Sequence, residues 1–251
     1  MQQTFFFVKK KDGKLQQVQD HQPLNKWIKK NKNVSPLLNQ VIGHLSGCLL
    51  FTTVDIHWGY NNIWIKEGDE YKVAFLTPEG LFKPTVMFFR LTNSPAMFQT
   101  MMNAIFWQEV GEGWLLVYMD NMAIHTTKLP HESKEQHLQW HQDYIHRILT
   151  KLEDNDLYLK PEKCKFKKEE IKYLGVIVGK NHLRMSPKKL QGVADWPVPR
   201  TPTNIQWFLG FTGYYQYFVP NYSAIAWPLL DLTKKTTPWH WGEKQFKPSK
   251  N

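Results

Sequence analysis

The sequence predicts an α+β fold with a separate helical subdomain at its C-terminal end. Two observations favour this class. Apolar runs of strand length, divided by turn residues, occur through the first two thirds of the chain. After Ser186-Pro187 the composition becomes helical. An order from strands to a mixture and then to helices is typical of α+β proteins. The 251 residues, 42% of them hydrophobic, suffice for one large domain or two to three small ones.

Strands and turns are expected in the first part of the chain. Residues 5–8 predict a strand, and the basic segment 9–14 that follows carries the turn signal Asp12-Gly13. Residues 49–56 predict a buried strand that ends on a carboxylate, Asp55. Two more strands are expected over 71–76 and 81–89, around the turn Thr77-Pro78-Glu79-Gly80.

The middle of the chain mixes helices with strands. Ser94-Pro95 predicts a helix start, because serine caps helices and proline suits the first turn, and apolar residues continue to about Val110. Two apolar strands, 114–118 and 122–124, are separated only by Met119-Asp120-Asn121, which predicts a tight hairpin. A long amphipathic helix is expected over 133–154, with its apolar face formed by Leu138, Ile145, Ile148, Leu149 and Leu152.

The last part of the chain begins with a hairpin over about 171–185. Three helices are then expected, near 187–196, 202–218 and 222–234. The tail from Lys244 to Asn251 is polar, which predicts a loose end.

Composition limits the partners and the compartment. The net charge of +10 indicates a polyanionic partner, nucleic acid or an anionic membrane, although charge alone also fits a merely basic soluble protein. The cations are 28 Lys and only four Arg. Cys48 and Cys164 form no CxxC pattern, which argues against a disulfide framework. No apolar run approaches the ~18 residues that span a membrane. We therefore expect an intracellular chain without a membrane partner.

Two aspartates are the first candidates for chemistry. Asp55 ends one apolar strand, and Asp120 lies at the tip of the hairpin between two others. A buried carboxylate is costly unless it is paired or holds a metal. Two carboxylates on adjacent strands are able to coordinate a pair of Mg²⁺ ions ~3.5–4 Å apart, the arrangement used for phosphoryl transfer. Spacing alone explains the pattern equally well as two ordinary turn aspartates.

Seven segments of the sequence, taken in order along the chain, favour the metal-binding interpretation over ordinary turn aspartates. They are Phe51–Tyr60, Leu91–Gln99, Tyr118–Asn121, Leu157–Cys164, Tyr173–Gly175, Phe208–Phe211 and Pro228–Thr233. These segments resemble the motifs of gypsy-type long-terminal-repeat retrotransposon reverse transcriptases, and Tyr118-Met119-Asp120-Asn121 resembles the Tyr-x-Asp-Asp motif of that family. The resemblance runs from about Phe5 to Trp241.

The resemblance implies a right-hand polymerase with an antiparallel palm sheet flanked by helices. The fingers would comprise 1–30 and 65–90, the palm 31–64 and 91–186, and the thumb 187–238. Residues 239–251 would be a tail at the start of a missing RNase H module. The implied partners are an RNA or DNA template with its primer, deoxynucleoside triphosphates, and the RNase H and integrase modules of a parent polyprotein. The implied location is the cytoplasm, a virus-like particle or the nucleus.

The resemblance also implies roles for single residues. Asp55, Asp120 and Asn121 occupy the catalytic positions, and the two aspartates would hold two Mg²⁺ ions, with Mn²⁺ as a substitute. Tyr60 would exclude a ribose 2′-hydroxyl. The positions implied for nucleotide binding are Lys10, Lys14, Trp58, Gly59, Tyr60, Phe89 and Arg90. Those implied for template and primer are Pro95, Tyr118, Met119, Tyr173, Leu174 and Gly175.

Several residues depart from the family pattern. Asn121 stands where the family has a second aspartate, and Arg90 where it usually has glycine. Gln16 and Gln22 replace two arginines of the fingers. Each change can arise from one G-to-A transition, which suggests a decayed transposon copy. The alternatives are a functional lineage that tolerates these residues, a remnant that only binds nucleic acid, and a structural subunit of a heterodimeric polymerase.

Two other groups of residues require an interpretation. His137 and His141 are spaced to bind zinc on a helix, with His131 and His146 nearby, but their positions predict solvated side chains on a polar face. Trp227, Trp239 and Trp241 are suited to stacking on bases, although packing against a downstream module is the favoured interpretation.

Overall fold

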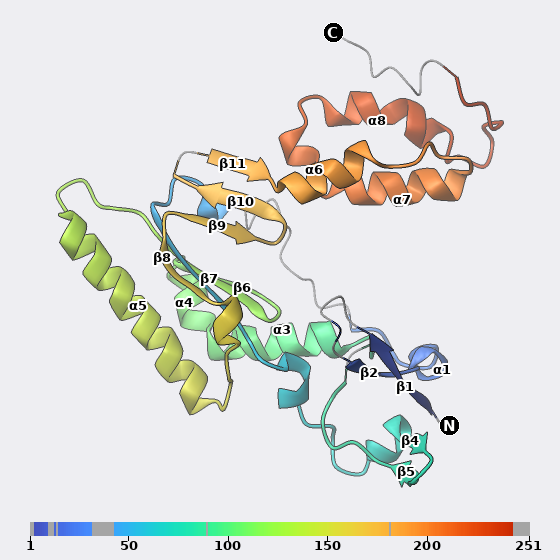
Figure 1. Ribbon diagram of the computed structural model, residues 1–251, viewed down its shortest axis with the longest axis horizontal. Helices are drawn as coiled ribbons and strands as arrows, with labels where there is room; N and C mark the ends of the chain where they lie inside the picture. The colour runs from blue at the N-terminus through green and yellow to red at the C-terminus, as the bar shows by residue number, and fades with distance from the viewer. Residues whose placement is uncertain are drawn as a thin grey trace. The chain divides into compact units, whose positions relative to one another are not determined.

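The computed structural model of the chain describes residues 3–9, 13, 15–31, 43–88, 90–180 and 182–242 (Figure 1). Lys10, Lys14, Phe89 and the tail 244–251 lie outside the described residues. The chain divides into two compact units. The first comprises the described residues of Met1–Pro36 and Cys48–Glu169, and the second those of Leu37–Gly47 and Glu170–Asn251.

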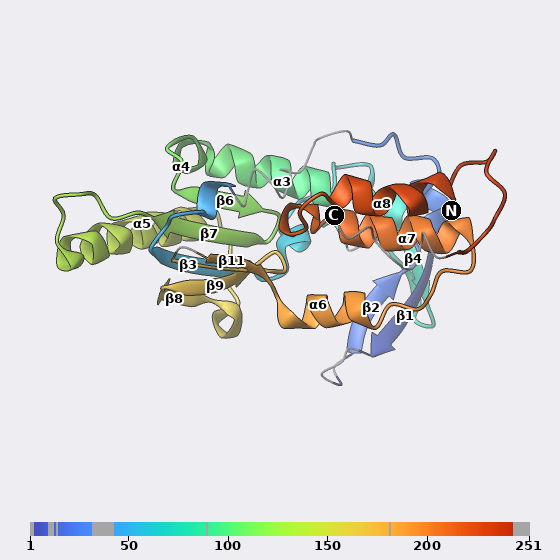
Figure 2. The same cartoon turned by 90° about the horizontal axis from the view of Figure 1, so that it is seen from above.

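The centre of the first unit is an antiparallel sheet with the strand order β6-β7-β3-β8. Its strands are β3 (Leu50–Asp55), β6 (Leu115–Tyr118), β7 (Asn121–Thr126) and β8 (Lys165–Lys168). Figure 2 shows β6, β7 and β3 side by side. The predicted hairpin is confirmed, but its turn is shorter than expected, because Asn121 already belongs to β7 and only Met119 and Asp120 connect the strands.

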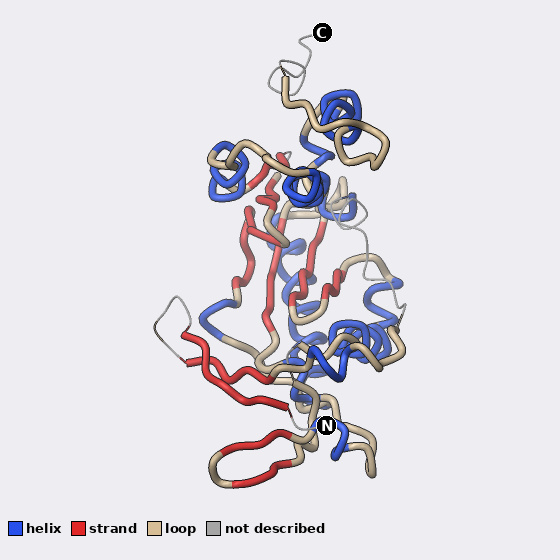
Figure 3. Tube along the Cα trace, turned by 90° about the vertical axis from the view of Figure 1, so that its right-hand side faces the viewer, coloured by secondary structure: helices blue, strands red, loops and turns tan. Residues whose placement is uncertain are grey.

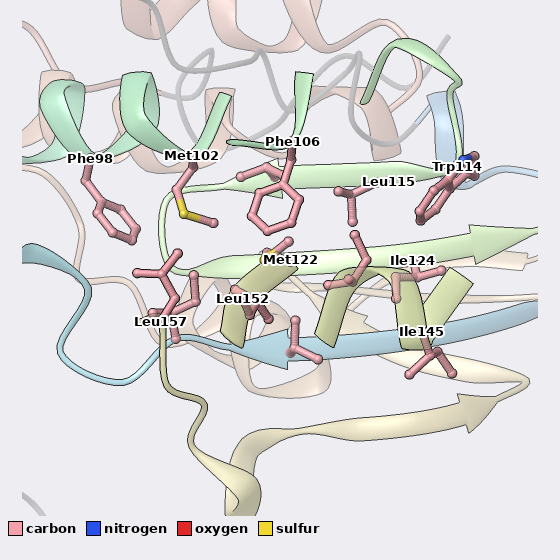
Figure 4. Packing of buried hydrophobic residues seen from close by; sticks show 14 residues of the cluster. Phe98, Met102, Phe106, Trp114, Leu115, Met122, Ile124, Ile145, Leu152 and Leu157 are labelled. Atoms are coloured by element: carbon pink, nitrogen blue, oxygen red, sulfur yellow. The ribbon is translucent and has the colours of Figure 1, made fainter. Parts of the chain in front are cut away.

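Helices cover one face of this sheet. They are α3 (Ser94–Ile105), α4 (Trp107–Gly111) and α5 (Lys134–Asp154). The helix expected from Ser94 to Val110 is interrupted at Phe106, whose φ of −109° leaves the helical region. Side chains of α3 and α5 meet those of the sheet in one buried cluster (Figure 4), which includes Val54, Ile56, Phe98, Met102, Phe106, Leu115, Met122, Ile124, Ile145, Ile148 and Leu152.

The predicted face of the long helix is partly wrong. Ile145, Ile148 and Leu152 are buried as expected, but Leu138 is exposed, whereas His137 and His141 are buried. The helix begins with a capping box, in which the Ser133 hydroxyl accepts from Gln136 N and the Gln136 side-chain oxygen accepts from Ser133 N. The buried stripe therefore runs at helical spacing from 137 through 141, 145, 148 and 152.

Both histidines are buried because the sheet offers them partners. The Thr126 hydroxyl lies 2.9 Å from His137 Nε2 and 2.9 Å from His141 Nδ1, and Thr52 Oγ1 lies 3.0 Å from His141 Nε2. Burial, with the neighbouring His137 and Lys167, lowers the pKa of His141 to about 4. Burial also lowers the pKa of His137. The expectation of solvated histidines was wrong, since hydroxyls that face a helix satisfy imidazoles without water.

A second sheet of the first unit has the order β2-β1-β4-β5. Its strands are β1 (Gln3–Lys9), β2 (Leu15–Gln19), β4 (Phe75–Thr77) and β5 (Gly80–Phe82), and α1 (Gln22–Asn25) follows β2. The strand at 5–8 is confirmed. The strand expected over 71–76 is instead a 3₁₀ helix, Glu70–Val73, followed by β4. The strand expected over 81–89 ends at Phe82, because Pro84 has no N–H to continue the ladder.

The second unit combines a small sheet with helices. The expected hairpin over 171–185 is a meander of β9 (Glu170–Tyr173), β10 (Val176–Gly179) and β11 (His182–Met185). The helices, drawn blue in Figure 3, are α6 (Pro187–Ala194), α7 (Pro202–Gly213) and α8 (Tyr222–Asp231). Each ends before its predicted limit. Trp239 and Trp241 stack on each other, with ring centroids 6.2 Å apart.

None of the helices in the described ranges is both long and apolar enough to cross a membrane. Short 3₁₀ helices also occur at Gly59–Asn62, Pro161–Lys163 and Gln216–Phe218. The first two lie next to the carboxylates considered below.

Candidate active site

Three adjacent strands place polar residues in one row across the sheet. Asp55, the last residue of β3, is paired in register with Asn121 of β7, and Asn121 is paired with Tyr118 of β6. Side chains alternate between the faces of a sheet. Since Val54 and Met122 point into the helix-covered core, the row of Asp55, Asn121 and Tyr118 belongs to the opposite face.

Asp120 joins this row from the turn between β6 and β7. Its backbone carbonyl accepts a hydrogen bond from Ile56 N at 2.9 Å, and its Oδ1 accepts from Asn121 Nδ2 at 3.2 Å. The predicted carboxylates therefore lie at the same end of neighbouring strands, with Asn121 beside them. Their role as metal ligands remains a prediction.

A glutamine of α3 holds the turn that carries Asp120. Gln99 is buried; its Oε1 accepts from Met119 N at 2.7 Å, and its Nε2 donates to Val117 O at 3.1 Å. Met119 has a φ of +51°, a conformation that needs such support in a residue other than glycine. Sequence reasoning quoted Gln99 within a motif but gave it no role, because the contact joins elements 20 residues apart.

Asp55 is buried and carries two cationic partners. Its Oδ1 accepts from Lys160 Nζ at 3.0 Å and its Oδ2 from Lys163 Nζ at 3.2 Å. Both lysines belong to the quoted segment Leu157–Cys164, yet the sequence analysis did not single them out. The only signal was that a buried carboxylate requires a partner.

The segment after Asp55 forms a compact corner. Trp58 is exposed, has a φ of +50° and stacks on His57. A side chain at Gly59 would meet the Phe98 ring at 2.8 Å, so only glycine fits there. Tyr60 packs edge-on against the same ring, with centroids 5.7 Å apart.

The Tyr60 hydroxyl is directed at the hairpin turn. It donates to Met119 Sδ at 3.7 Å, and burial together with the nearby Asp120 raises the pKa of Tyr60. The structure thus brings Tyr60 to the turn that carries Asp120, and its role in excluding a ribose 2′-hydroxyl stays a prediction. Phe98, which shapes both Gly59 and Tyr60, had no predicted role.

Arg90 lies in a turn with a φ of +75°, and its carbonyl accepts from Asn25 Nδ2 at 2.9 Å. This backbone conformation suits glycine, the residue that the family usually has at this position. Pro95 occupies the first turn of α3, as predicted. Lys10, Lys14 and Phe89, the other nucleotide-binding candidates, lie outside the described residues.

Tyr173, Leu174 and Gly175 belong to the second unit, at the turn from β9 to β10. The Tyr173 side chain is buried, and the Leu174 carbonyl accepts from Tyr214 Oη at 2.7 Å. A Cβ at Gly175 would meet Tyr215 Oη at 2.8 Å. This turn is therefore held by the two tyrosines that directly follow α7, and a role in holding the primer stays a prediction.

The donor set suits a hard divalent cation. Among the described residues, no group of three or more His, Cys, Asp or Glu side chains is arranged to hold a metal. Magnesium in phosphate-handling sites is bound by one or two carboxylates together with substrate phosphates, so Asp55 and Asp120 fit such an ion. Asn121 offers a neutral oxygen and is the weaker ligand.

A comparison with known families decides the identity of the chain. Residues 8–178 match the family model of reverse transcriptase (RNA-dependent DNA polymerase). The chain belongs to the reverse transcriptase family. The Tf2-7 transposon polyprotein of Schizosaccharomyces pombe is 33% identical over 245 residues, which are 98% of this chain and 18% of the polyprotein. The Tf2-3 transposon polyprotein of the same yeast is 32% identical over the same length. The predicted gypsy-type retrotransposon reverse transcriptase is confirmed.

Solved reverse transcriptases share the fold. A foamy viral protease-reverse transcriptase in complex with double-stranded DNA has a TM-score of 0.81 at 20% identity, over 98% of this chain and 42% of that one. A foamy viral protease-reverse transcriptase in complex with an RNA/DNA hybrid has a TM-score of 0.73 at 20% identity, over 98% of this chain and 32% of that one. The predicted α+β polymerase fold is confirmed. The reverse transcriptase chain described here spans about a fifth of its transposon relatives, 18%.

Proposed function

We propose that this reverse transcriptase domain extends a primer by templated nucleotidyl transfer and that Asn121 impairs the step. The observation that supports it is the register of β3 with β7, which sets Asp55 opposite Asn121 and next to Asp120. The substrates would be an RNA or DNA template with its primer and deoxynucleoside triphosphates. The parent polyprotein would add RNase H and integrase modules. We expect the domain to act inside the cell, in the cytoplasm, a virus-like particle or the nucleus.

The chemistry assigns a part to each residue of the site. Two bound Mg²⁺ ions would activate the primer 3′-hydroxyl and neutralise the charge on the triphosphate. Asp55 and Asp120 would hold them, with Asn121 as the third position. Gln99 fixes the turn, so that Asp120 needs no rearrangement. Tyr60, rigid against Phe98, would exclude a ribose 2′-hydroxyl from the nucleotide position.

The second candidate is a remnant that binds nucleic acid but does not catalyse. Two independent departures favour it: the neutral Asn121 at the carboxylate position, and Arg90 in a backbone conformation suited to glycine. Both fit the decay of a transposon copy by G-to-A transitions.

Restoring the lost carboxylate tests the choice. Asn121→Asp changes one atom type and adds a hard anionic ligand beside Asp120. Even outer partners of metal sites contribute ~10–100-fold, so primer extension on an RNA template in Mg²⁺ should rise by at least about tenfold. Asn155→Asp, at the exposed end of α5, adds the same charge away from the site and should leave the rate unchanged.

The outcomes separate the candidates. Equal extension by the unaltered chain and by Asn121→Asp would show that Asn121 is a tolerated ligand. If Asn121→Asp alone stays inactive, Arg90→Gly is added, and then Gln16→Arg and Gln22→Arg. No extension by the combined variant in Mg²⁺ or Mn²⁺, with nucleic-acid binding intact, would support the binding-only remnant.

A further inference from the structure

Lys160 places its ammonium between two oxygens at the end of β3. Its Nζ donates to Asp55 Oδ1 at 3.0 Å and to the backbone carbonyl of Ile56 at 3.1 Å. Lys163 makes one contact, with the other Asp55 oxygen at 3.2 Å. The side chain of Lys160 is 21% exposed, against 54% for Lys163. The Lys160 ammonium is therefore the more buried of the two and contacts two oxygens, whereas the Lys163 ammonium is more exposed and contacts one.

The backbone fixes the point from which Lys160 extends. Ile56 and Leu159 form an antiparallel bridge. On either side of it, Lys160 N donates to Asp55 O at 2.9 Å and His57 N donates to Tyr158 O at 2.7 Å. The segment 158–160 thus continues the sheet alongside Asp55. The Lys160 side chain therefore extends to the Asp55 carboxylate from a backbone segment that is hydrogen-bonded to the sheet.

The oxygens that Lys160 contacts are of the kind that a divalent ion uses. Carboxylate and backbone carbonyl oxygens are hard ligands, suited to Mg²⁺ and Mn²⁺. The local charges also cancel: Asp55 and Asp120 contribute −2, and Lys160 and Lys163 contribute +2. An aspartate at position 121 would leave the group at −1. The lysines therefore oppose the approach of a second cation.

We propose that the Lys160 ammonium occupies a cation position of this site and that a divalent metal must displace it to reach Asp55. This rests on the proposed function, in which Asp55 is a metal ligand. Lys160 is then a tethered cation that neutralises Asp55 in the metal-free chain and sets the affinity for the metal. Lys163 contributes charge but does not occupy the position.

Mn²⁺ binding tests the proposal without any catalytic readout. Free aqueous Mn²⁺ is followed by electron paramagnetic resonance during titration of the full chain, without nucleotide or nucleic acid. Lys160→Met should lower the Kd for Mn²⁺ by about tenfold, the scale of partners that surround a metal ligand. Lys163→Met removes the same charge and should change it much less. Lys160→Gln serves as a second neutral variant, and circular dichroism verifies folding.

Asp55→Asn assigns the binding to this site. Combined with Lys160→Met, it should abolish the gain in affinity. An unchanged Kd in Lys160→Met and Lys160→Gln, with binding still weakened by Asp55→Asn, would overturn the proposal while leaving the metal site intact. Equal gains in Mn²⁺ affinity in Lys160→Met and Lys163→Met would show that only the loss of a positive charge matters, which would also overturn the proposal. If Asp55→Asn leaves the Kd for Mn²⁺ unchanged in every variant, Asp55 is not a metal ligand. The metal-binding role that the proposed function gives to Asp55 would then also be wrong.

Discussion

Arg90 has a left-handed backbone, and this single residue predicts a gain in stability on substitution. A left-handed conformation costs a residue with a Cβ about 1–2 kcal/mol. Glycine relieves that cost, but it also increases the entropy of the unfolded chain, which lowers stability by about 0.4–1 kcal/mol. Arg90→Gly should therefore raise the free energy of unfolding by roughly 0.5–1 kcal/mol, measured by urea denaturation.

Arg90→Ala is the matched control, since it removes the same exposed side chain but keeps the Cβ. It should show no gain. If the two variants are equally stable, the side chain rather than the backbone sets the difference, and the strain at φ +75° is not what limits this turn.

At this scale the sequence predicts which residues carry charge but not what they contact. The proximity of Asp55, Asp120 and Asn121 follows from a strand end and a hairpin, which are local features. The partners of Asp55 do not follow, because Lys160 is 105 residues away in the chain. Gln99 and Phe98 escaped notice for the same reason: each acts through a contact between elements, and no local pattern marks it.

At the scale of elements, a buried glutamate joins α4 to α5. Glu109 is fully buried; its carboxylate lies 2.8 Å from Arg147 Nε and 2.7 Å from Lys151 Nζ. Glu112 pairs with Arg147 at 3.0 Å but is 38% exposed. Removing one partner of a buried ion pair leaves uncompensated charge.

Glu109→Ala should lower the free energy of unfolding by roughly 2–3 kcal/mol, below the upper range for buried pairs because Arg147 and Lys151 are partly exposed. Glu112→Ala removes the same side chain from an exposed pair and should cost less than about 1 kcal/mol. Chemical denaturation of both variants measures the difference. Equal losses would mean that the buried pair has no special weight.

The buried histidine of α5 predicts a pH dependence of stability. The pKa of His141 falls from the ordinary histidine value of 6.5 to about 4 in the folded chain, chiefly through burial. Between these values the unfolded chain binds the proton and the folded chain does not. Stability is therefore fully present above about pH 6.5 and is lost as the pH falls towards 4, by on the order of 1–2 kcal/mol between pH 7 and pH 5.

Urea denaturation at pH 7 and pH 5 measures this loss. His141→Gln keeps a hydrogen-bonding side chain without the titration and should flatten the dependence. His146→Gln removes an imidazole from the exposed side of the same helix and serves as the control. A profile as steep in His141→Gln as in the unaltered chain would exclude His141 as a source, and would direct attention to His21, whose pKa burial also lowers to about 4.

Element types were easier to predict than faces and ends. The long helix, the hairpin and the three last helices exist where the apolar spacing indicates. The buried face of α5 was misjudged because hydropathy ranks leucine above histidine, whereas Thr52 and Thr126 supply the partners that make buried histidines favourable. The strand expected over 81–89 ends at Phe82, two residues before Pro84. Proline disfavours a continuing strand, and the apolar residues around it led the prediction to pass over that signal.

For the whole molecule, the net charge predicts how binding responds to salt. A charge of +10 supplied mainly by lysines should give affinity for a primer–template duplex that falls with ionic strength. The expected slope of log K against log salt is about −0.9 per phosphate neutralised on B-form DNA. Fluorescence anisotropy with a labelled duplex over a range of NaCl measures it. An affinity that is independent of salt would contradict a basic binding surface.

Some features of the whole molecule could be predicted from the sequence and others could not. Charge and the order of elements are summed properties, and the sequence predicts them well. The boundaries of fingers, palm and thumb remain predictions. The chain passes from the first compact unit to the second at Glu170, where β9 begins, at the end of the charged run Lys167-Lys168-Glu169-Glu170.

Thr52 and Thr126 lie on adjacent strands, and both are hydrogen-bonded to His141 of α5. A fluctuation that lifted α5 from the sheet would leave hydroxyls and imidazoles unpaired in the interior, at a cost of about 1–3 kcal/mol for each group. Partial opening is therefore disfavoured relative to complete unfolding. We therefore expect the amides of β3, β7 and α5 to exchange their hydrogens with solvent together, as one cooperative block, when the first unit unfolds.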